Sequence, residues 1–231
     1  MEFKKNKKLI NLLIKFIKLI KLINLKMITL FSYYYLSLSY PYYYNPNIHN
    51  FGNIGIGGKI HANLSPFATK MIDVIRYNNK NIRHELMSEY KNDKILDLCC
   101  GIGISTYDNS IGIDTSHEML NVAKRINTNK TFYYGNSETY KPNYEIDIVS
   151  CMFSFHEMPN EAHYKIIDNA FKIAKKEIII VDISPNYNPS KIMITGEPYL
   201  NNYLKTISNV LDDFEETILI PHHVHVWKYV I

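Results

Sequence analysis

The sequence predicts an α/β protein built on a doubly wound, mostly parallel sheet. The first observation is that short runs rich in Ile and Val alternate with helical segments from Lys94 to the end of the chain. Such alternation is typical of a parallel sheet covered by helices on both faces. The second is a glycine-containing turn, residues 99–103, which leaves the first of these strands. A strand, a glycine turn and a second strand form the front of a βαβ unit.

The elements of the predicted sheet come in chain order. Strands are expected over residues 94–98, 111–114, 131–134, 146–151 and 177–183, and helices over 116–126, 160–175 and 197–210. Two further strands, 216–220 and 223–230, flank Pro221. Because so short a connection joins antiparallel strands, the sheet is expected to end in an antiparallel pair.

Two helices are expected before the sheet. Ser65 and Pro66 suit the N-cap and the first position of a helix that runs to about Tyr77. A second helix is expected over residues 82–90. The run from Gly52 to Gly58 is similar to a phosphate loop, but no strand precedes it and no Lys-Ser/Thr pair ends it, so it is predicted to be a flexible loop.

The chain divides into a basic N-terminal segment, a linker and one domain, with boundaries at 1–26, 27–50 and 51–231. Residues 1–26 carry eight lysines and one glutamate, and the lysines of 4–26 gather on one arc of a helical wheel. This pattern predicts a basic amphipathic helix that anchors to a membrane surface or directs the chain to an organelle. The alternative is an upstream extension without a role, with Met27 as the true start. Residues 27–50 are aromatic and turn-prone, as a linker is.

The charge outside the basic segment argues against a nucleic-acid partner. Residues 27–231 hold 18 basic and 21 acidic side chains, a net charge of −3. A protein that binds a polyanion usually has a basic body.

The cysteines and histidines predict neither a disulfide framework nor a metal site. Cys99 and Cys100 are adjacent and Cys151 lies in another strand, which fits a reducing compartment such as the cytoplasm. His223 and His225 alternate onto one strand face, but no cysteine or nearby carboxylate completes a set of ligands.

Two motifs at the front of the sheet carry the chemistry. Asp97 ends the first strand, and Gly101 and Gly103 let a ligand approach the backbone where a Cβ would obstruct it. Asp114 ends the second strand, where an acid can accept hydrogen bonds from a ribose diol. Thr115 or Ser116 caps the next helix.

Taken together, these motifs resemble the S-adenosylmethionine site of class I methyltransferases, because Asp114 and the following Ser116 and Met119-Leu120 match the family's acid-x-Ser-x-x-Met-Leu pattern. The resemblance implies a Rossmann-like, seven-stranded sheet with one reversed strand and N-terminal covering helices. It implies that the turn, with Cys99 in place of the family's first glycine, holds the methionyl part, and that Asn136 meets the adenine amine. The cofactor-binding residues expected on this basis are Asp97, Cys99, Gly101, Gly103, Asp114, Thr115, Asn136, Ser137, Ser150 and Met152.

A nicotinamide-dependent dehydrogenase is the competing interpretation, since it also places an acid on ribose. Its fingerprint needs a third glycine, and Thr106 occupies that place. One feature departs from both families. Only eight residues separate Gly103 from Gly112, so the crossover helix can have little more than one or two turns.

The exit of the fourth strand predicts the acceptor side of the site. Ligands bind at the carboxyl ends of strands in a doubly wound sheet. Phe153-Ser-Phe-His-Glu157 is similar to the exit found in small-molecule methyltransferases of the type-11 kind. His156 and Glu157 are therefore the candidate catalytic residues, with His156 a general base or a substrate-orienting group. The alternative is that His156 only packs against the next helix.

The expected function is transfer of a methyl group from S-adenosylmethionine to a small, lipophilic acceptor. Two alternatives stay open at this stage. One is a protein or RNA methyltransferase, and the other is a cofactor-binding scaffold that has lost catalysis.

Overall fold

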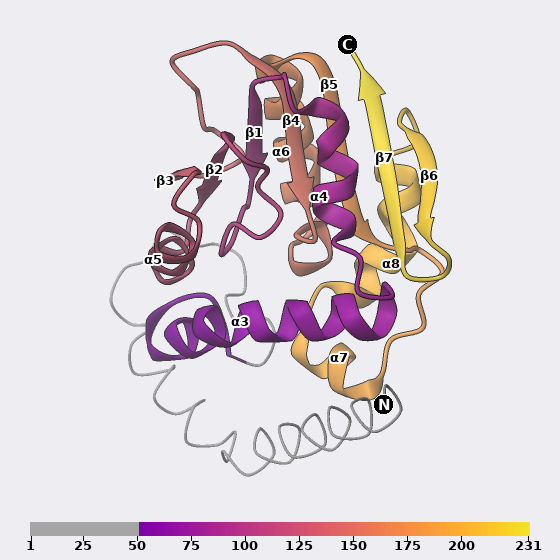
Figure 1. Ribbon diagram of the computed structural model, residues 1–231. Coiled ribbons are helices and arrows are strands. Elements are labelled where there is room, and N and C mark those ends of the chain that lie inside the picture. The colour runs from indigo at the N-terminus through magenta and orange to yellow at the C-terminus, as the bar shows by residue number, and fades with distance from the viewer. Residues whose placement is uncertain (1–50) are drawn as a thin grey trace. The chain divides into compact units, whose positions relative to one another are not determined.

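The structure is a computed structural model that describes residues 51–231 (Figure 1). The predicted basic helix over 1–26 and the linker over 27–50 lie outside the described residues. Within residues 51–231, no helix is both long and apolar enough to cross a membrane.

The centre of the domain is a seven-stranded sheet in the order β3-β2-β1-β4-β5-β7-β6. The strands are β1 (Ile95–Leu98), β2 (Ile111–Asp114), β3 (Thr131–Tyr134), β4 (Ile146–Met152), β5 (Ala174–Ile183), β6 (Glu215–Ile220) and β7 (Val224–Val230). Strands β1 to β5 pair in parallel, and β7 pairs antiparallel with both β5 and β6. The predicted doubly wound, mostly parallel, Rossmann-like sheet with one reversed strand is confirmed.

Apolar side chains of the central strands alternate between two covered faces. Leu96 and Leu98 face the core that α6 (Asn160–Ile173) and α8 (Leu200–Val210) cover. Ile95, on the opposite side of the strand, faces a second core that includes Ile82 and Met87 of α4 (Ile82–Met87). Helix α5 (His117–Ile126) packs along the β2 and β3 side. The period of two in the strands thus places a helical layer on each face.

Helix α3 (Gly55–Arg76) corrects two predictions made for the N-terminal part of the domain. Gly55 to Gly58, the second part of the glycine run expected as a flexible loop, form the first turn of this helix, and Pro66 lies inside the helix rather than at its start. The glycines serve a close approach of the chain, because a Cβ on Gly57 would lie 1.9 Å from the carbonyl oxygen of Phe51. Pro66 has no backbone N–H, so the helix lacks one hydrogen bond at this position. The other backbone hydrogen bonds of the 22-residue helix outweigh this loss.

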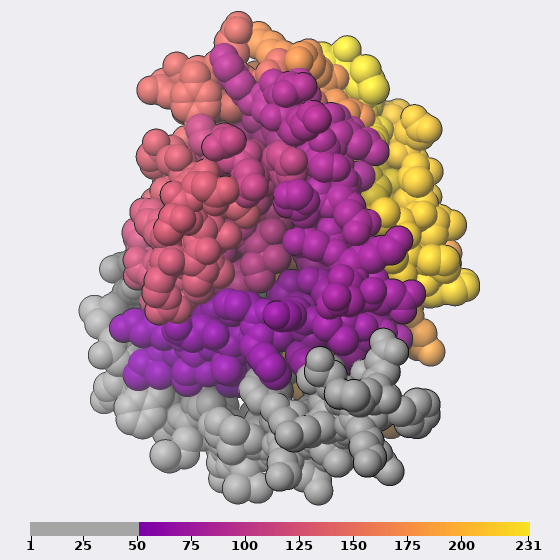
Figure 2. Space-filling view, in the orientation of Figure 1, coloured from indigo at the N-terminus to yellow at the C-terminus, as the bar shows by residue number. Residues whose placement is uncertain are grey.

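The connection between β1 and β2 holds no helix, which agrees with the expectation that so few residues leave room for little more than one or two turns. Residues 99–110 form turns only, because they are too few to cross the sheet as a helix. Helix α3 covers the vacated region. Ala62 of α3 packs with Ile102 of the connection and with Met119 and Val122 of α5. In Figure 1, α3 runs across the carboxyl ends of the central strands and α4 lies in front of the sheet, and in Figure 2 the atoms of this part of the chain form the front surface of the domain.

The remaining differences concern the ends of helices. Helix α6 ends at Ile173 and passes directly into β5. The helix predicted over 197–210 is α8, which begins later than predicted, at Leu200, because Pro198 disfavours a helical conformation for the residue before it. A further helix that was not predicted, α7 (Lys191–Gly196), precedes it. Short 3₁₀ turns come after α4 at Ser88–Tyr90 (η1) and after β4 at Phe155–Glu157 (η2).

Candidate active site

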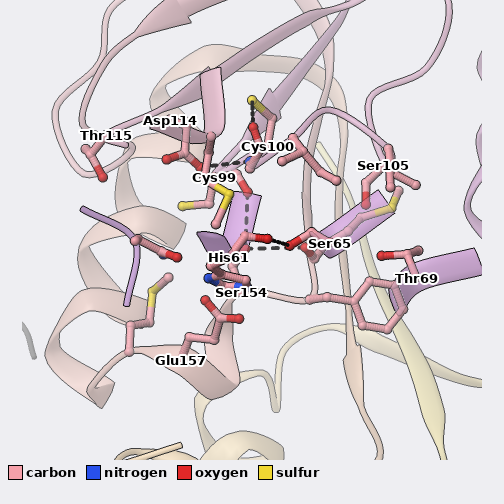
Figure 3. Close-up of a pocket in the computed structure, with 18 of the residues that line it drawn as sticks. His61, Ser65, Thr69, Cys99, Cys100, Ser105, Asp114, Thr115, Ser154 and Glu157 are labelled. Carbon is pink, nitrogen blue, oxygen red and sulfur yellow. Dashed lines mark hydrogen bonds between the residues drawn. The ribbon is translucent and has the colours of Figure 1, made fainter. Parts of the chain in front are cut away.

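A pocket of about 280 Å³ opens at the carboxyl edge of the sheet (Figure 3). Its wall consists of four parts of the chain: the segment before α3 with three residues of α3 itself, Arg83 of α4, the β1–β2 connection, and the carboxyl ends of β2 and β4 with the residues next to them. Ligand pockets of doubly wound sheets lie at this edge. Of the residues predicted from the sequence, six line the pocket: Cys99, Gly101, Asp114, Thr115, Met152 and Glu157.

The turn after β1 has the backbone conformation that glycine favours. Cys99 has φ +56° and Gly101 has φ +53°, both in the left-handed region. A Cβ built on Gly101 meets no atom within 4 Å, so this glycine faces open space in the pocket wall. Cys99 is held by Ser137, whose hydroxyl accepts a hydrogen bond from the Cys99 backbone N–H at 3.2 Å. The turn therefore presents backbone rather than side chains to a ligand.

Asp114 organises the pocket end of β2. Its two carboxylate oxygens accept hydrogen bonds from the backbone N–H groups of Gly101 at 2.8 Å and Ser116 at 2.7 Å. Burial raises the pKa of this carboxyl, and the two N–H donors work against that rise. Each oxygen keeps a further lone pair, so the carboxylate can also accept from a diol.

Asp97 lies beneath the turn and outside the pocket lining. Thr106 Oγ1 donates to its Oδ2 at 2.6 Å, and Ser150 Oγ donates to its Oδ1 at 3.0 Å. The side chain is buried, and burial raises its pKa to about 6 against the effect of these two hydroxyls. The predicted cofactor residues Asp97 and Ser150 thus bond to each other.

Three more predicted cofactor residues lie outside the pocket lining. Gly103 lies against the core, since a Cβ there would be 2.4 Å from the Phe132 ring. Asn136 closes a turn by accepting a hydrogen bond from the Glu138 backbone N–H at 2.9 Å. Ser137 supports Cys99 instead of facing the pocket.

The two predicted catalytic residues have different environments. Glu157 lines the pocket, whereas His156 is only 4% exposed and does not. His156 Nδ1 lies 2.6 Å from Asp182 Oδ1, and its Nε2 lies 3.9 Å from Glu157 Oε1. Burial lowers the pKa of His156, but the charge of Asp182 outweighs burial and raises it. The two ring nitrogens therefore face the carboxylates of Asp182 and Glu157.

Asp182, on β5, holds the residues that follow β4, and the sequence did not single it out. Its carboxylate accepts hydrogen bonds from the backbone N–H groups of Phe155 and Ile183, each at 2.7 Å, and of His156 at 3.2 Å. These bonds hold η2 against the end of β5. The surroundings of His156 therefore agree in part with the alternative that it has a packing role, since its ring is buried against Asp182.

Sequence reasoning missed the side chains that the N-terminal helices bring to the pocket. These are Asn53 before α3, His61, Ser65 and Thr69 on α3, and Arg83 on α4. Arg83 is nearly buried, pairs with Asp73 at 2.8 Å, and lies over the Phe153 ring at 4.5 Å from its centroid. For the residues on α3, the one signal in the sequence was the alternation of small and polar residues along the helix. That pattern is also typical of an ordinary surface helix, so it does not single out a site.

The C-terminal histidines form no metal site in the described part of the chain. No group of three or more His, Cys, Asp or Glu side chains is placed to hold a metal ion among residues 51–231. One expectation is corrected here. A carboxylate does lie near these histidines, because Glu216 on β6 pairs with His225 across the hairpin.

Comparison with known proteins finds a family match in the central part of the domain. Residues 95–177 match the family described as "Methyltransferase domain". No curated protein matches the sequence.

Solved structures with the same fold include methyltransferases. The plantazolicin methyltransferase BamL has a TM-score of 0.52 at 16% identity, over 76% of this chain and 91% of that one. The pyocyanin biosynthetic protein PhzM has a TM-score of 0.54 at 11% identity, over 74% of this chain and 60% of that one. At such identities the likeness concerns the fold. Residues 95–177 thus match the methyltransferase domain family, and they lie in a sheet with the strand order and the carboxyl-edge pocket of the class I S-adenosylmethionine-dependent methyltransferase fold.

Proposed function

We propose that the pocket binds S-adenosylmethionine and directs its methyl group to a small-molecule acceptor. The observation that carries this proposal is that one pocket contains the open turn at Gly101, the Asp114 carboxylate and, from η2, the Glu157 carboxylate. The first two suit the cofactor and the third lies where an acceptor would approach. Helix α3 lies across this edge of the sheet, which favours an acceptor small enough to fit beneath it (Figure 1).

The residues present fit the cofactor. The side-chain oxygen of Asn53 is buried in the pocket wall and has no hydrogen-bond partner, so it suits a ligand that brings a donor. The ribose hydroxyls and the amino groups of S-adenosylmethionine are such donors. In this arrangement Asp114 and Thr115 hold the ribose, and the backbone around Gly101 holds the methionyl part.

When bound, S-adenosylmethionine supplies a methyl carbon that its positive sulfur already activates. The protein then has to align the acceptor with this carbon and exclude water. Met152, Phe153 and Met158 contribute apolar wall to the pocket. Glu157 orients the acceptor, and the buried ring of His156, with Nε2 3.9 Å from Glu157 Oε1, supports the Glu157 carboxylate from behind.

Two considerations support a small molecule rather than a nucleic acid or protein. The net charge of −3 over residues 27–231 does not favour a polyanion. The similar structures include BamL in complex with a triazolic desmethylPZN analog and SAH, and PhzM, a pyocyanin biosynthetic protein. Both likenesses support a small acceptor for this chain, and the apolar wall suits a lipophilic one.

The experiment is a binding isotherm for S-adenosylhomocysteine by calorimetry, with Asp114→Asn as the test variant and Asp168→Asn as the control. Asp168 is an exposed carboxylate on α6, paired with Lys172. Loss of hydrogen bonds to a charged group costs about 1.5–3 kcal/mol each, so Asp114→Asn should weaken binding by about tenfold to a hundredfold. Equal affinity in both variants would contradict the placement of the cofactor.

Turnover then separates an enzyme from a scaffold. The wild-type protein is incubated with S-adenosylmethionine carrying a labelled methyl group and a metabolite extract. Label in a small product supports the proposal. Binding without any label in product favours the non-catalytic scaffold, whereas label in added protein or RNA favours the other class of methyltransferase.

A further inference from the structure

Helix α3 brings a second histidine to the pocket, and no sequence motif points to it. His61 lines the pocket together with Ser154 and Glu157. Figure 3 shows the Glu157 carboxylate pointing toward the ring of His61. The two residues are 96 positions apart in the chain, and only the path of α3 across the sheet edge brings them together.

The ring of His61 is held in one orientation by the backbone. Its Nδ1 lies 3.0 Å from the carbonyl oxygen of Gly52. A carbonyl oxygen has no proton to give, so Nδ1 carries the hydrogen and donates it. In the neutral ring Nε2 is then the basic nitrogen, as in histidines that act as proton acceptors.

His156 is the weaker candidate for this role. It is buried and absent from the pocket lining. Its Nδ1 lies 2.6 Å from the Asp182 carboxylate and its Nε2 faces Glu157, so neither ring nitrogen faces the open pocket. His61, in contrast, is partly exposed within the pocket that holds Glu157.

We propose that His61 is the general base of this enzyme and that its acceptors carry an O–H or N–H group. The acceptor oxygen or nitrogen forms a bond to the methyl carbon while the carbon–sulfur bond breaks and its electron pair stays on sulfur. The acceptor proton passes to Nε2 of His61 and later to solvent. The Glu157 carboxylate stabilises the cation that forms on the ring. This inference rests on the proposed function, since it assigns a proton acceptor to that same pocket.

Several titratable or charged groups line the same pocket as His61. They are Arg83 from α4, Cys99 and Cys100 from the β1–β2 connection, Asp114 from β2, and Glu157 from η2. The two carboxylates favour the protonated ring and the guanidinium opposes it. Because several of these groups can titrate, the pH profile of the wild-type rate has to be compared with that of a His61 variant.

The test variant is His61→Asn, whose amide can still donate to the Gly52 carbonyl but cannot accept a proton near neutral pH. The control is His222→Asn, because His222 is exposed and lies outside this pocket. Removal of a general base lowers turnover by about 10²–10⁴-fold. Transfer of labelled methyl to the metabolite extract should fall by this factor in His61→Asn only. S-adenosylhomocysteine affinity should stay within about threefold of wild type in both variants, which is below a change of about 1 kcal/mol.

Two further readouts separate a base from a structural residue. The wild-type rate at low acceptor concentration should rise with pH as the His61 ring loses its proton, and this rise should be absent in His61→Asn. Added imidazole should restore part of the rate in His61→Ala. Full turnover in His61→Asn would contradict the assignment of His61 as the base. A loss of S-adenosylhomocysteine affinity in His61→Asn as large as its loss of rate would contradict it too. Neither outcome would contradict the proposed function. Wild-type products methylated on thioethers or tertiary amines contradict the acceptor class. Failure of the wild-type protein to bind S-adenosylhomocysteine contradicts the proposed function instead.

Discussion

Cys99 is the residue at which the turn departs most from a glycine loop. It adopts φ +56° without being glycine, and its thiol lies 3.2 Å from the Ser137 hydroxyl. A left-handed conformation costs an ordinary residue about 1–2 kcal/mol. The contacts with Ser137 offset part of this cost.

A paired substitution measures that conformational cost. Both Cys99→Ala and Cys99→Gly remove the thiol, so their difference isolates the backbone. We expect the Gly variant to be more stable than the Ala variant by about 1 kcal/mol in urea unfolding. The same pair at Cys100, whose φ is not positive, should give the opposite order. An Ala variant at residue 99 that equals or exceeds the Gly variant would show that the turn is not strained.

The buried Asp97 carboxyl predicts a dependence of stability on pH. Burial raises its pKa to about 6 in the folded protein, against about 3.9 in an unfolded chain. Between these values the folded state binds more protons than the unfolded state, so the free energy of unfolding falls as pH rises from about 4 to about 6. The contribution of Asp97 to stability is therefore lowest above about pH 6.

The measurement compares wild type with Asp97→Asn in urea between about pH 4.5 and 7.5, a range that spans the raised pKa. The free energy of unfolding of wild type minus that of the variant should decrease with rising pH, by about 1.4 kcal/mol for each unit of pKa shift. Asp168→Asn, at an exposed site, is the control: the free energy of unfolding of wild type minus that of Asp168→Asn should stay constant over this pH range. A difference that rises with pH would mean that Asp97 is stabilised as a carboxylate, for example by its two hydroxyl donors.

At the scale of elements, α3 replaces the missing crossover helix. Its first turn is tied to the β2–α5 corner by two hydrogen bonds: Gly55 N–H donates to Glu118 Oε1 at 2.8 Å, and Ser116 Oγ donates to the Asn53 carbonyl. Ser116 also caps α5 by accepting from the Met119 N–H at 3.1 Å. The element that lines the acceptor side is thus attached to the element that ends in Asp114.

Gly57→Ala should loosen this attachment. The new Cβ would lie 1.9 Å from the Phe51 carbonyl oxygen, and backbone cannot yield as a flexible side chain does. Overpacking of this kind costs about 1–3 kcal/mol. We expect a lower urea midpoint together with weaker binding of S-adenosylhomocysteine, since Asn53 and Ile54 line the pocket. Lys70→Ala, at an exposed position of α3, is the control and should change neither. A lower midpoint with unchanged affinity would separate α3 from the cofactor site.

For the whole molecule, charge is concentrated in the N-terminal segment. Residues 1–26 have a net charge of +7 and the rest of the chain has −3. Removal of 1–26 should leave S-adenosylhomocysteine affinity unchanged and reduce binding to vesicles that contain phosphatidylserine. Each lysine near an anionic surface contributes about 1 kcal/mol, and the loss should be greatest at low salt. Neutral phosphatidylcholine vesicles are the control. Equal binding of full-length and shortened chains to anionic vesicles would exclude the surface-anchor hypothesis.

The sequence by itself determined the sheet and the ends of its strands. Strand periodicity is local, so β2 and β3 lie where their Ile- and aromatic-rich runs predict them, and Asp114 falls at a carboxyl end as expected. The tertiary structure decided which side chains reach the pocket. His156 comes after β4 as predicted, yet its ring turns to Asp182, because the β5 strand lies beside β4 and offers a buried carboxylate. His61 reaches the pocket because α3 fills the space that the short β1–β2 connection leaves. Local patterns carry no information on such contacts, which depend on how distant segments pack.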